Sequence, residues 1–443
     1  MKLNNKSDTQ QRTFEALPEK LLLKGGRLID RSLDLDETAD ILIGDGVIES
    51  VGKIDTTGFD GEIKDISGMV VSPGWIDMHV HLREPGREDK ETIETGSFAA
   101  ANGGFTAVCC MPNTTPAIDK QEIIQYIKDR ARESLVNVHP IAAITKNREG
   151  KELSEILHLV QQGAVAISDD GDPVMSAEIM RRALEYSKMV GIPVIGHEED
   201  VTMTVDCHIN EGYISTLLGV RGIPSVAEDI MIARDIMLTE YSGGHFHVAH
   251  IATAKSVELV REAKKKGISV TAEATPHHFT LTDEAVRTFD TNTKMKPPLR
   301  TQEDIDAIIE GLKDGTIDVI ATDHAPHSWE EKASEFIFAP FGILGLETAI
   351  GLSMKQLVQT TVLGLKELVE KFTVNPYKII GLDCPVVEKG KSANLTIFDP
   401  EADWKYDSAN SLSKSSNTPF NGWEFKGKPH MVINNNKSFT SIL

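Results

Sequence analysis

The sequence predicts an α/β protein built on a TIM-like (β/α)8 barrel, with a small composite β domain formed from both chain ends. Between residues 74 and 323, eight apolar strand-like runs alternate with amphipathic helical segments, which is typical of a parallel barrel. Before and after this region, short strand-like runs are separated by turn residues, and the N-terminal part shows no helical period.

The eight predicted barrel strands are residues 74–81, 105–111, 136–142, 164–169, 192–197, 245–250, 268–275 and 317–323. Predicted helices between them include residues 120–133, 176–190, 226–238, 253–266 and 303–313. Two longer segments interrupt the alternation. We expect a loop with a short helix over residues 198–225, and no single regular element over the proline-containing residues 276–300.

The predicted domains are residues 1–72 as the N-terminal part of the β domain, 73–385 as the barrel, and 386–443 as the C-terminal part of the β domain. Residues 1–20 form a polar lead-in before the first strand-like run. After the barrel, residues 344–371 are predicted to be helical, and Asn375 and Pro376 are expected to break that helix.

Composition restricts the classes of function. The chain has 443 residues and a net charge of -21, which argues against a general nucleic-acid binder and means that an anionic substrate needs local positive charge. The four cysteines lack a Cys-x-x-Cys spacing, so we expect a reducing compartment. Because the chain shows neither a membrane-length apolar run nor a signal-peptide core, we expect a cytoplasmic protein that does not contact membranes.

The first predicted barrel strand ends in a His-x-His pair. Because side chains alternate along a strand, His79 and His81 point to the same side and can share one metal ion. Arg83 has the same parity, so it can hold an anion in the same pocket.

Four further residues of types that bind metal ions lie at the ends of predicted strands: Asp170, His197, His250 and Asp323. The carboxyl ends of barrel strands meet at one mouth, where active sites of such barrels lie. With His79 and His81 they suit one or two divalent ions, zinc being the first choice and Asp170 a bridging ligand. Such ions lower the pKa of bound water and polarise a carbonyl, and Asp323 is the candidate for moving the proton.

The sequence resembles the type I dihydroorotases of the amidohydrolase superfamily. The motifs that carry this resemblance run in the family's order over nearly the whole chain. They are DMHVHLREPG (77–86), MPNT (111–114), SDDG (168–171), GHEE (196–199), HVAHI (247–251), TPHH (275–278), ATDHAPH (321–327) and PFG (340–342).

The resemblance implies zinc-dependent, reversible cyclisation of N-carbamoyl-aspartate to dihydroorotate in pyrimidine biosynthesis. It implies one zinc on His79, His81 and Asp323, and a second on His197 and His250, with Asp170 as the bridge. It also implies a set of substrate-binding residues, in which the carboxylate meets Arg83, Asn113 and His327, and the ring meets the backbone at Phe341 and Gly342; His81 completes this set.

Two positions depart from the pattern of relatives. Many members of the superfamily bridge their metals with a carboxylated lysine, but this chain has Ser168 at that position. Asp170 is therefore the expected bridge. The missing lysine also argues against the hydantoinase and allantoinase branches. Type I dihydroorotases usually have asparagine before the double proline, whereas this chain has Lys296. An ammonium contact in place of the asparagine and an altered site are the two alternatives.

Two other functions stay open beside a dihydroorotase. One is a catalytically silent homologue that serves as a partner of aspartate transcarbamoylase, which would be expected to have lost metal ligands. The other is a hydrolase of a different cyclic amide, against which Arg83, Asn113 and His327 favour a substrate that carries a carboxylate. A homo-oligomer and an association with aspartate transcarbamoylase are both compatible with the resemblance.

Overall fold

The computed structural model describes residues 13–443, so most of the predicted polar lead-in lies outside the described residues. Eight parallel strands pair in chain order, and a bridge between Val80 and His324 joins the two ends of the sheet. The strands are β7 (Trp75–Val80), β8 (Phe105–Cys110), β9 (Asn137–Ala142), β10 (Ala166–Ser168), β11 (Val194–Gly196), β14 (Phe246–Val248), β15 (Val270–Ala274) and β16 (Val319–Ile320). The predicted parallel barrel is confirmed.

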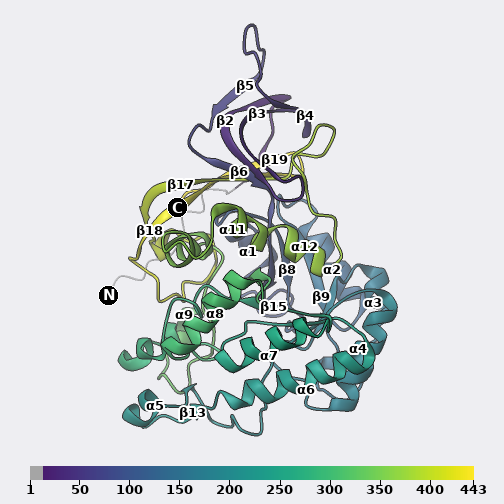
Figure 1. Ribbon diagram of the computed structural model, residues 1–443, viewed down its shortest axis with the longest axis vertical. Coiled ribbons are helices and arrows are strands. Elements are labelled where there is room, and N and C mark those ends of the chain that lie inside the picture. Colours follow the sequence, from purple (N-terminus) through teal and green to yellow (C-terminus); the bar gives the residue numbers. More distant parts are fainter. Residues whose placement is uncertain (1–12) are drawn as a thin grey trace.

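Helices surround the barrel on its outside (Figure 1). They are α1 (Ile93–Asn102), α2 (Gln121–Ala131), α3 (Ile156–Gln162), α4 (Ala177–Val190), α6 (Val226–Ser242), α7 (Ala254–Lys265) and α8 (Gln302–Asp314). Side-chain caps fix two of the predicted starts, because the hydroxyls of Ser176 and Thr253 accept hydrogen bonds from backbone N–H groups in the first turns of α4 and α7. The five predicted helices are confirmed, each starting within one residue of its expected position.

A second, nine-stranded sheet combines both chain ends (Figure 1). Its central junction pairs β6 with β17 in antiparallel register, with Ser72 opposite Thr396. Leucine and isoleucine side chains from both ends form one buried core in this sheet. Its strands are β1 (Glu15–Ala16), β2 (Lys20–Asp30), β3 (Leu35–Gly44), β4 (Val47–Gly52), β5 (Glu62–Asp65), β6 (Val70–Pro73), β17 (Leu395–Lys405), β18 (Glu424–Asn434) and β19 (Lys437–Thr440). The predicted composite β domain is confirmed.

The prediction of one helix over residues 344–371 is wrong. The structure has α10 (Ala349–Ser353), a π-helical turn (Met354–Val358), a non-helical stretch in which Thr361 has a φ of 60°, and then α11 (Leu365–Phe372). Pro376 does not break a helix either, because it lies in the first turn of α12 (Val374–Ile379). A proline there costs little, since that N–H has no partner within the helix.

The long segment between β11 and α6 contains β12 (Ile209–Asn210), the short helix α5 (Tyr213–Leu218) and β13 (Gly222–Ile223), as expected for a loop with a short helix.

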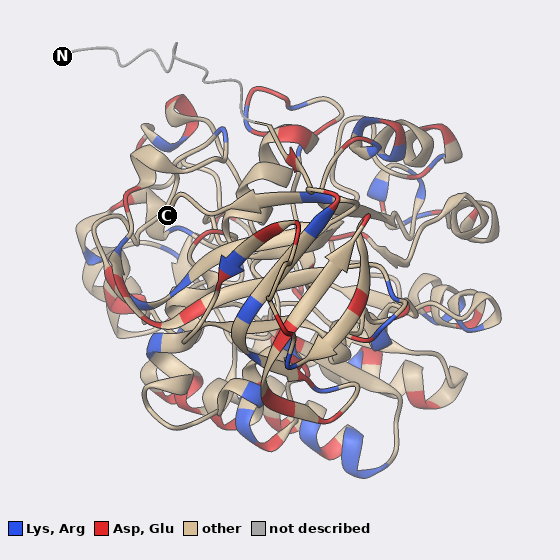
Figure 2. Cartoon of the chain, turned by 90° about the horizontal axis from the view of Figure 1, so that it is seen from above, with Lys and Arg blue, Asp and Glu red and all other residues tan. Residues whose placement is uncertain are grey.

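Over the helices at the rim of the molecule, Lys and Arg positions alternate with Asp and Glu positions (Figure 2). Within residues 13–443, no helix combines the length and apolar character needed to cross a bilayer.

Candidate active site

Asp170 lies at the centre of a buried cluster at the carboxyl ends of the barrel strands. It follows β10 by two residues, and its backbone N–H donates to the hydroxyl of Ser168 at 3.1 Å. The serine at the position expected for a bridging lysine therefore shapes the turn that presents the Asp170 carboxylate.

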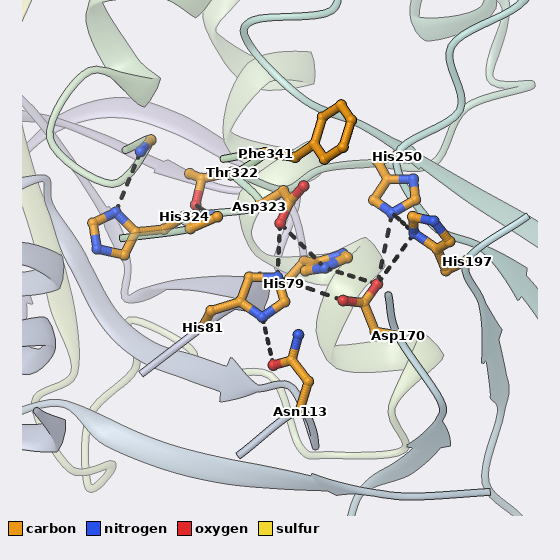
Figure 3. A network of polar contacts seen from close by, with 12 residues as sticks. His79, His81, Asn113, Asp170, His197, His250, Thr322, Asp323, His324 and Phe341 are labelled. Carbon is orange, nitrogen blue, oxygen red and sulfur yellow. Dashed lines mark hydrogen bonds and ion pairs between the residues drawn. The ribbon is translucent and has the colours of Figure 1, made fainter. Parts of the chain in front are cut away.

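Two histidine pairs lie on either side of the Asp170 carboxylate (Figure 3). On one side, His79 Nε2 lies 3.4 Å from Oδ1 and His81 Nε2 lies 3.5 Å from Oδ2. On the other side, His250 Nε2 and His197 Nδ1 lie 3.6 and 3.7 Å from Oδ1. One carboxylate is thus shared by imidazoles from three different strand ends.

Asp323 completes the cluster beside the first histidine pair. Its Oδ1 lies 2.9 Å from His81 Nε2 and 3.5 Å from His79 Nε2. Asp323 and His250 both adopt a left-handed backbone, with φ of 47° and 32°. Such conformations are costly for residues other than glycine and persist where the surrounding structure imposes them, often at functional sites. Here they turn both side chains into the cluster, beyond the last paired residue of each strand.

The arrangement of donor atoms fits one or two divalent metal ions. At metal–ligand distances of about 2.0 to 2.1 Å, neighbouring ligands of a tetrahedral site lie about 3.4 Å apart, close to the separations between Asp170 and its histidines. Among the described residues, the buried His79 Nε2 and Asp170 Oδ1 have no hydrogen-bond partner. Three sets have ligand atoms within 4.8 Å of one another: His79, His81 and Asp170; His79, His250 and Asp323; Asp170, His197 and His250.

The two carboxyl groups of the cluster, Asp170 and Asp323, both have lowered pKa values. Burial raises the pKa of Asp323, but His79 and His81 outweigh it and lower that pKa to about 2. For Asp170 burial acts in the same direction, and the neighbouring histidines, His79 foremost, again prevail and hold its pKa well below the ordinary value. Both carboxylates are therefore ionised at neutral pH, which is the form in which a carboxylate binds a metal ion.

Glu273 on β15 contacts this cluster and was not predicted from the sequence. Its Oε1 accepts a hydrogen bond from His79 Nδ1 at 2.6 Å, and its Oε2 lies 3.2 Å from His247 Nε2. The bond to Nδ1 leaves the Nε2 lone pair of His79 facing the cluster, as in carboxylate–histidine–metal arrangements. The available signal was a single charged residue inside the predicted strand 268–275, since a buried charge needs a partner.

A cavity of about 340 Å³ opens onto the cluster. It brings together five of the six metal-ligand candidates, all except the fully buried His79, and all of the predicted substrate-binding residues. Its lining includes His81, Arg83, Asn113, Asp170, His197, His250, Lys296, Asp323, His327, Phe341 and Gly342. Arg83 has a φ of 60° and donates from Nε to the Pro326 carbonyl at 3.2 Å. Burial lowers the pKa of Arg83 to about 10, so its guanidinium stays charged at neutral pH.

Asn113 connects the cavity to the cluster. Its Oδ1 lies 2.8 Å from His81 Nδ1 and accepts a hydrogen bond from it (Figure 3). This bond directs the Nε2 lone pair of His81 toward Asp170 and Asp323, and it leaves the Asn113 amide nitrogen available to the cavity.

Gly342 lies at the cavity wall where only glycine fits. Its φ is 150°, and a Cβ there would come within 2.7 Å of the Ala325 carbonyl. Its backbone N–H donates to the Lys294 carbonyl at 2.9 Å, and its carbonyl accepts from Asn417 Nδ2 at 3.0 Å. The backbone that was predicted to meet the substrate ring is therefore already bonded on both sides, which fixes its position.

Lys296 places an ammonium group in the cavity wall. Its Nζ lies 2.9 Å from Glu199 Oε2 and 5.3 Å from the centroid of the Phe341 ring. The same Glu199 oxygen lies 3.4 Å from His197 Nε2. The position that is usually asparagine thus carries a positive charge that is paired with the carboxylate behind a metal-ligand candidate.

Two buried lysines hold the segment that carries Phe341. Lys294 Nζ donates to the carbonyls of Phe336 and Ile337 at 2.8 and 2.9 Å. In return, Lys332 on α9 (Trp329–Lys332) donates from Nζ to the carbonyls of Thr291 and Pro340, at 2.9 and 2.8 Å. These bonds tie residues 328–342 to the segment before the double proline.

The Lys332→Met variant tests the electrostatic cost of this arrangement. Burial, with a contribution from Lys294, lowers the pKa of Lys332 to about 7, while Asp290 and Glu331 partly oppose the shift. Unfolded lysine keeps a pKa near 10.4, so between pH 7 and 10 the unfolded state binds more protons and stability rises with pH. We expect Lys332→Met to flatten the rise of the unfolding temperature across this range. The exposed Lys265→Met should keep the wild-type slope, and equal slopes for all three proteins would contradict the account.

Comparisons with known proteins agree with this geometry. A family model described as dihydro-orotase-like matches residues 68–256. The dihydroorotase of Pelotomaculum thermopropionicum is 52% identical over 415 residues, covering 94% of this chain and 97% of the relative. The chain belongs to the dihydroorotase family. A second member, the dihydroorotase of Acetivibrio thermocellus, is 49% identical over 416 residues, covering 94% of this chain and 97% of that relative.

Solved structures place the dihydroorotase family fold among cyclic-amide hydrolases. The L-hydantoinase (dihydropyrimidinase) from Arthrobacter aurescens superposes with a TM-score of 0.84 at 25% identity, covering 97% of this chain and 96% of that one. A D-hydantoinase (dihydropyrimidinase) from Thermus sp. superposes with a TM-score of 0.79 at 25% identity, covering 95% of both chains. The similarity extends over the barrel and the composite β domain together.

Proposed function

We propose that this member of the dihydroorotase family catalyses the reversible cyclisation of N-carbamoyl-L-aspartate to L-dihydroorotate, as a cytoplasmic step of pyrimidine biosynthesis. One observation carries the proposal. The set of six metal-ligand candidates is complete, and five of them line the same cavity as the Arg83 guanidinium, with His79 buried behind them, so a carboxylate-bearing cyclic amide can meet both the cluster and Arg83. A silent homologue would not be expected to retain this set.

The proposed cofactor is two zinc ions. His79, His81 and Asp323 would hold one, His197 and His250 the other, and Asp170 would bridge them. When bound, these ions supply Lewis-acid activation of water and of the amide carbonyl. The contribution of Asp170 is to keep the two halves of the cluster at a fixed separation, since its carboxylate contacts both histidine pairs.

In the proposed reaction, the remaining steps fall to side chains of the cavity. Arg83 binds the substrate carboxylate through its charged guanidinium, with Asn113 and His327 beside it. In the hydrolytic direction, Asp323 accepts a proton from the attacking water and gives it to the nitrogen of the breaking ring amide bond. Its ionised state at neutral pH suits the first of these transfers.

Rates on two cyclic amides test the proposed substrate. L-dihydroorotate carries the ring carboxylate and dihydrouracil lacks it. We expect the wild-type protein to prefer dihydroorotate in kcat/KM by about 100-fold or more, because an unpaired buried guanidinium is costly. The Arg83→Met variant should lose most of this preference, mainly through a higher KM for dihydroorotate. Equal rates on the two compounds, or a preference for dihydrouracil, would favour a different cyclic-amide hydrolase.

A further inference from the structure

The imidazole of His327 contacts two charged side chains that the proposed reaction does not use, Lys90 and Glu331. Lys90, which is 6% exposed, places its Nζ 3.1 Å from His327 Nδ1. Glu331 Oε2 lies 3.2 Å from the same Nδ1 and 2.9 Å from Lys90 Nζ. On the opposite side of the ring, Nε2 lies 2.8 Å from the Phe341 carbonyl and 3.5 Å from Arg83 Nη2.

One neutral tautomer satisfies the closest contact of each ring nitrogen, with Lys90 at Nδ1 and the Phe341 carbonyl at Nε2. Lys90 also donates to Glu331 Oε2 at 2.9 Å, which offsets the approach of that oxygen to the Nδ1 lone pair at 3.2 Å. A lysine ammonium has no acceptor, so it can bond to Nδ1 only if Nδ1 offers its lone pair. The Phe341 carbonyl is an acceptor, so Nε2 must carry the hydrogen. The other neutral tautomer would turn two acceptors toward each other at 2.8 Å. A protonated ring would add a third positive charge beside Arg83 and Lys90.

We propose that Lys90 is a positioning residue that holds His327 as the neutral tautomer with its hydrogen on Nε2, so that this N–H fixes the Phe341 carbonyl in the cavity wall, beside the Arg83 guanidinium that would bind the substrate carboxylate. This inference rests on the proposed function for the identity of the anion. Glu331 neutralises the charge of Lys90, and it receives a second ion pair from Arg87 at 2.9 Å. Lys90 thus donates to the ring and to Glu331 at once.

The electrostatics of the site point the same way. Burial, together with the positive charges of Arg83 and Lys90, lowers the pKa of His327 to about 2, with Lys332 adding to the effect and Glu331 opposing it. The ring is therefore neutral at physiological pH, and the choice that remains is between its two tautomers. Lys90 makes that choice from outside the cavity wall, since it contacts the ring nitrogen on the side away from Phe341.

Removing Lys90 should let the ring take up a second proton. Without the ammonium, Glu331 Oε2 remains beside Nδ1 and can only accept a hydrogen bond, while the Phe341 carbonyl still accepts from Nε2, so Nδ1 should become protonated in addition to Nε2 in the Lys90→Met variant. Lys90→Arg keeps a cationic donor and should retain the wild-type tautomer. Glu331→Gln leaves Lys90 in place, so it should also retain it. Lys371→Met removes another buried lysine, whose ammonium donates to the Ile317 carbonyl before β16, and serves as the control.

Long-range nitrogen NMR on protein labelled with ¹⁵N in histidine reads the tautomer directly, with His327 identified by the signal lost in His327→Gln. We expect wild-type His327 to be protonated on Nε2 alone at neutral pH, Lys90→Met to gain a proton on Nδ1 while it keeps the one on Nε2, and the other variants to match the wild type.

A wild-type His327 protonated on Nδ1, or a Lys90→Met variant whose His327 keeps the wild-type protonation state, overturns the role of Lys90. The wild-type spectrum decides the first point even if Lys90→Met fails to fold. If the wild-type protein does not turn over dihydroorotate at all, the proposed function fails, whereas the NMR result still decides which tautomer Lys90 imposes.

Discussion

The Asp323→Asn variant is expected to lose about 10²- to 10⁴-fold in kcat for dihydroorotate, the range that general acid–base catalysis contributes. The amide keeps the shape of the carboxylate and its place 2.9 Å from His81, but it cannot accept and return a proton. The measurement is kcat and metal content on the same preparation, so that lost chemistry is separated from lost metal.

Asp318→Asn provides the matched control for this variant. Asp318 lies just before the other end of the same strand, where it pairs with Lys264 and accepts a hydrogen bond from the Ala272 N–H. Its amide variant should retain a near-wild-type rate. If Asp323→Asn also retained a near-wild-type rate at full metal content, Asp323 would not be the proton carrier.

The Asp170→Ala variant is expected to lose at least one of the two proposed metal ions, and with it almost all turnover. Asp170 is the only carboxylate that contacts both histidine pairs among the described residues of the cluster. His197 and His250 share one group of ligand candidates, and Asp170 is the only carboxylate in that group. Without Asp170, the group has two histidines and no carboxylate. Elemental analysis of the purified variant measures the metal content.

Asp172→Ala is the comparison for this loss. Asp172 lies on the same turn, its side chain is 61% exposed, and it pairs with Arg148 instead of the cluster. This variant should bind the wild-type amount of metal. An unchanged metal content in Asp170→Ala would show that Asp170 is not a bridging ligand.

The position of the site could be predicted because a parallel barrel aligns its strand ends. His79 and His81 differ by one strand period, and the remaining candidates each follow a recognisable apolar run. The structure brings all six candidates together around Asp170. Their assignment as metal ligands and substrate contacts stays a prediction, as do the domain boundaries after residues 72 and 385.

The residues that hold these side chains in place could not be found in the same way. Glu273 bonds to His79 across 194 positions of sequence, and Lys90 reaches His327 across 237. Such pairs follow from how distant strands and loops meet, which no local period encodes. The prediction of one helix over residues 344–371 failed although a local pattern was present. The apolar spacing of a helix continues through this segment, but the backbone is not helical around Thr361, and α11 begins only at Leu365.

The rate of L-dihydroorotate hydrolysis by chelator-treated protein, followed as zinc is added back, tests the central claim most directly. The account predicts almost no turnover without metal, a rise in rate with bound zinc, and a plateau near two ions per chain. Turnover that persists without metal, or its absence in the fully loaded protein, would contradict the assignment of this cluster as a metal-dependent dihydroorotase site.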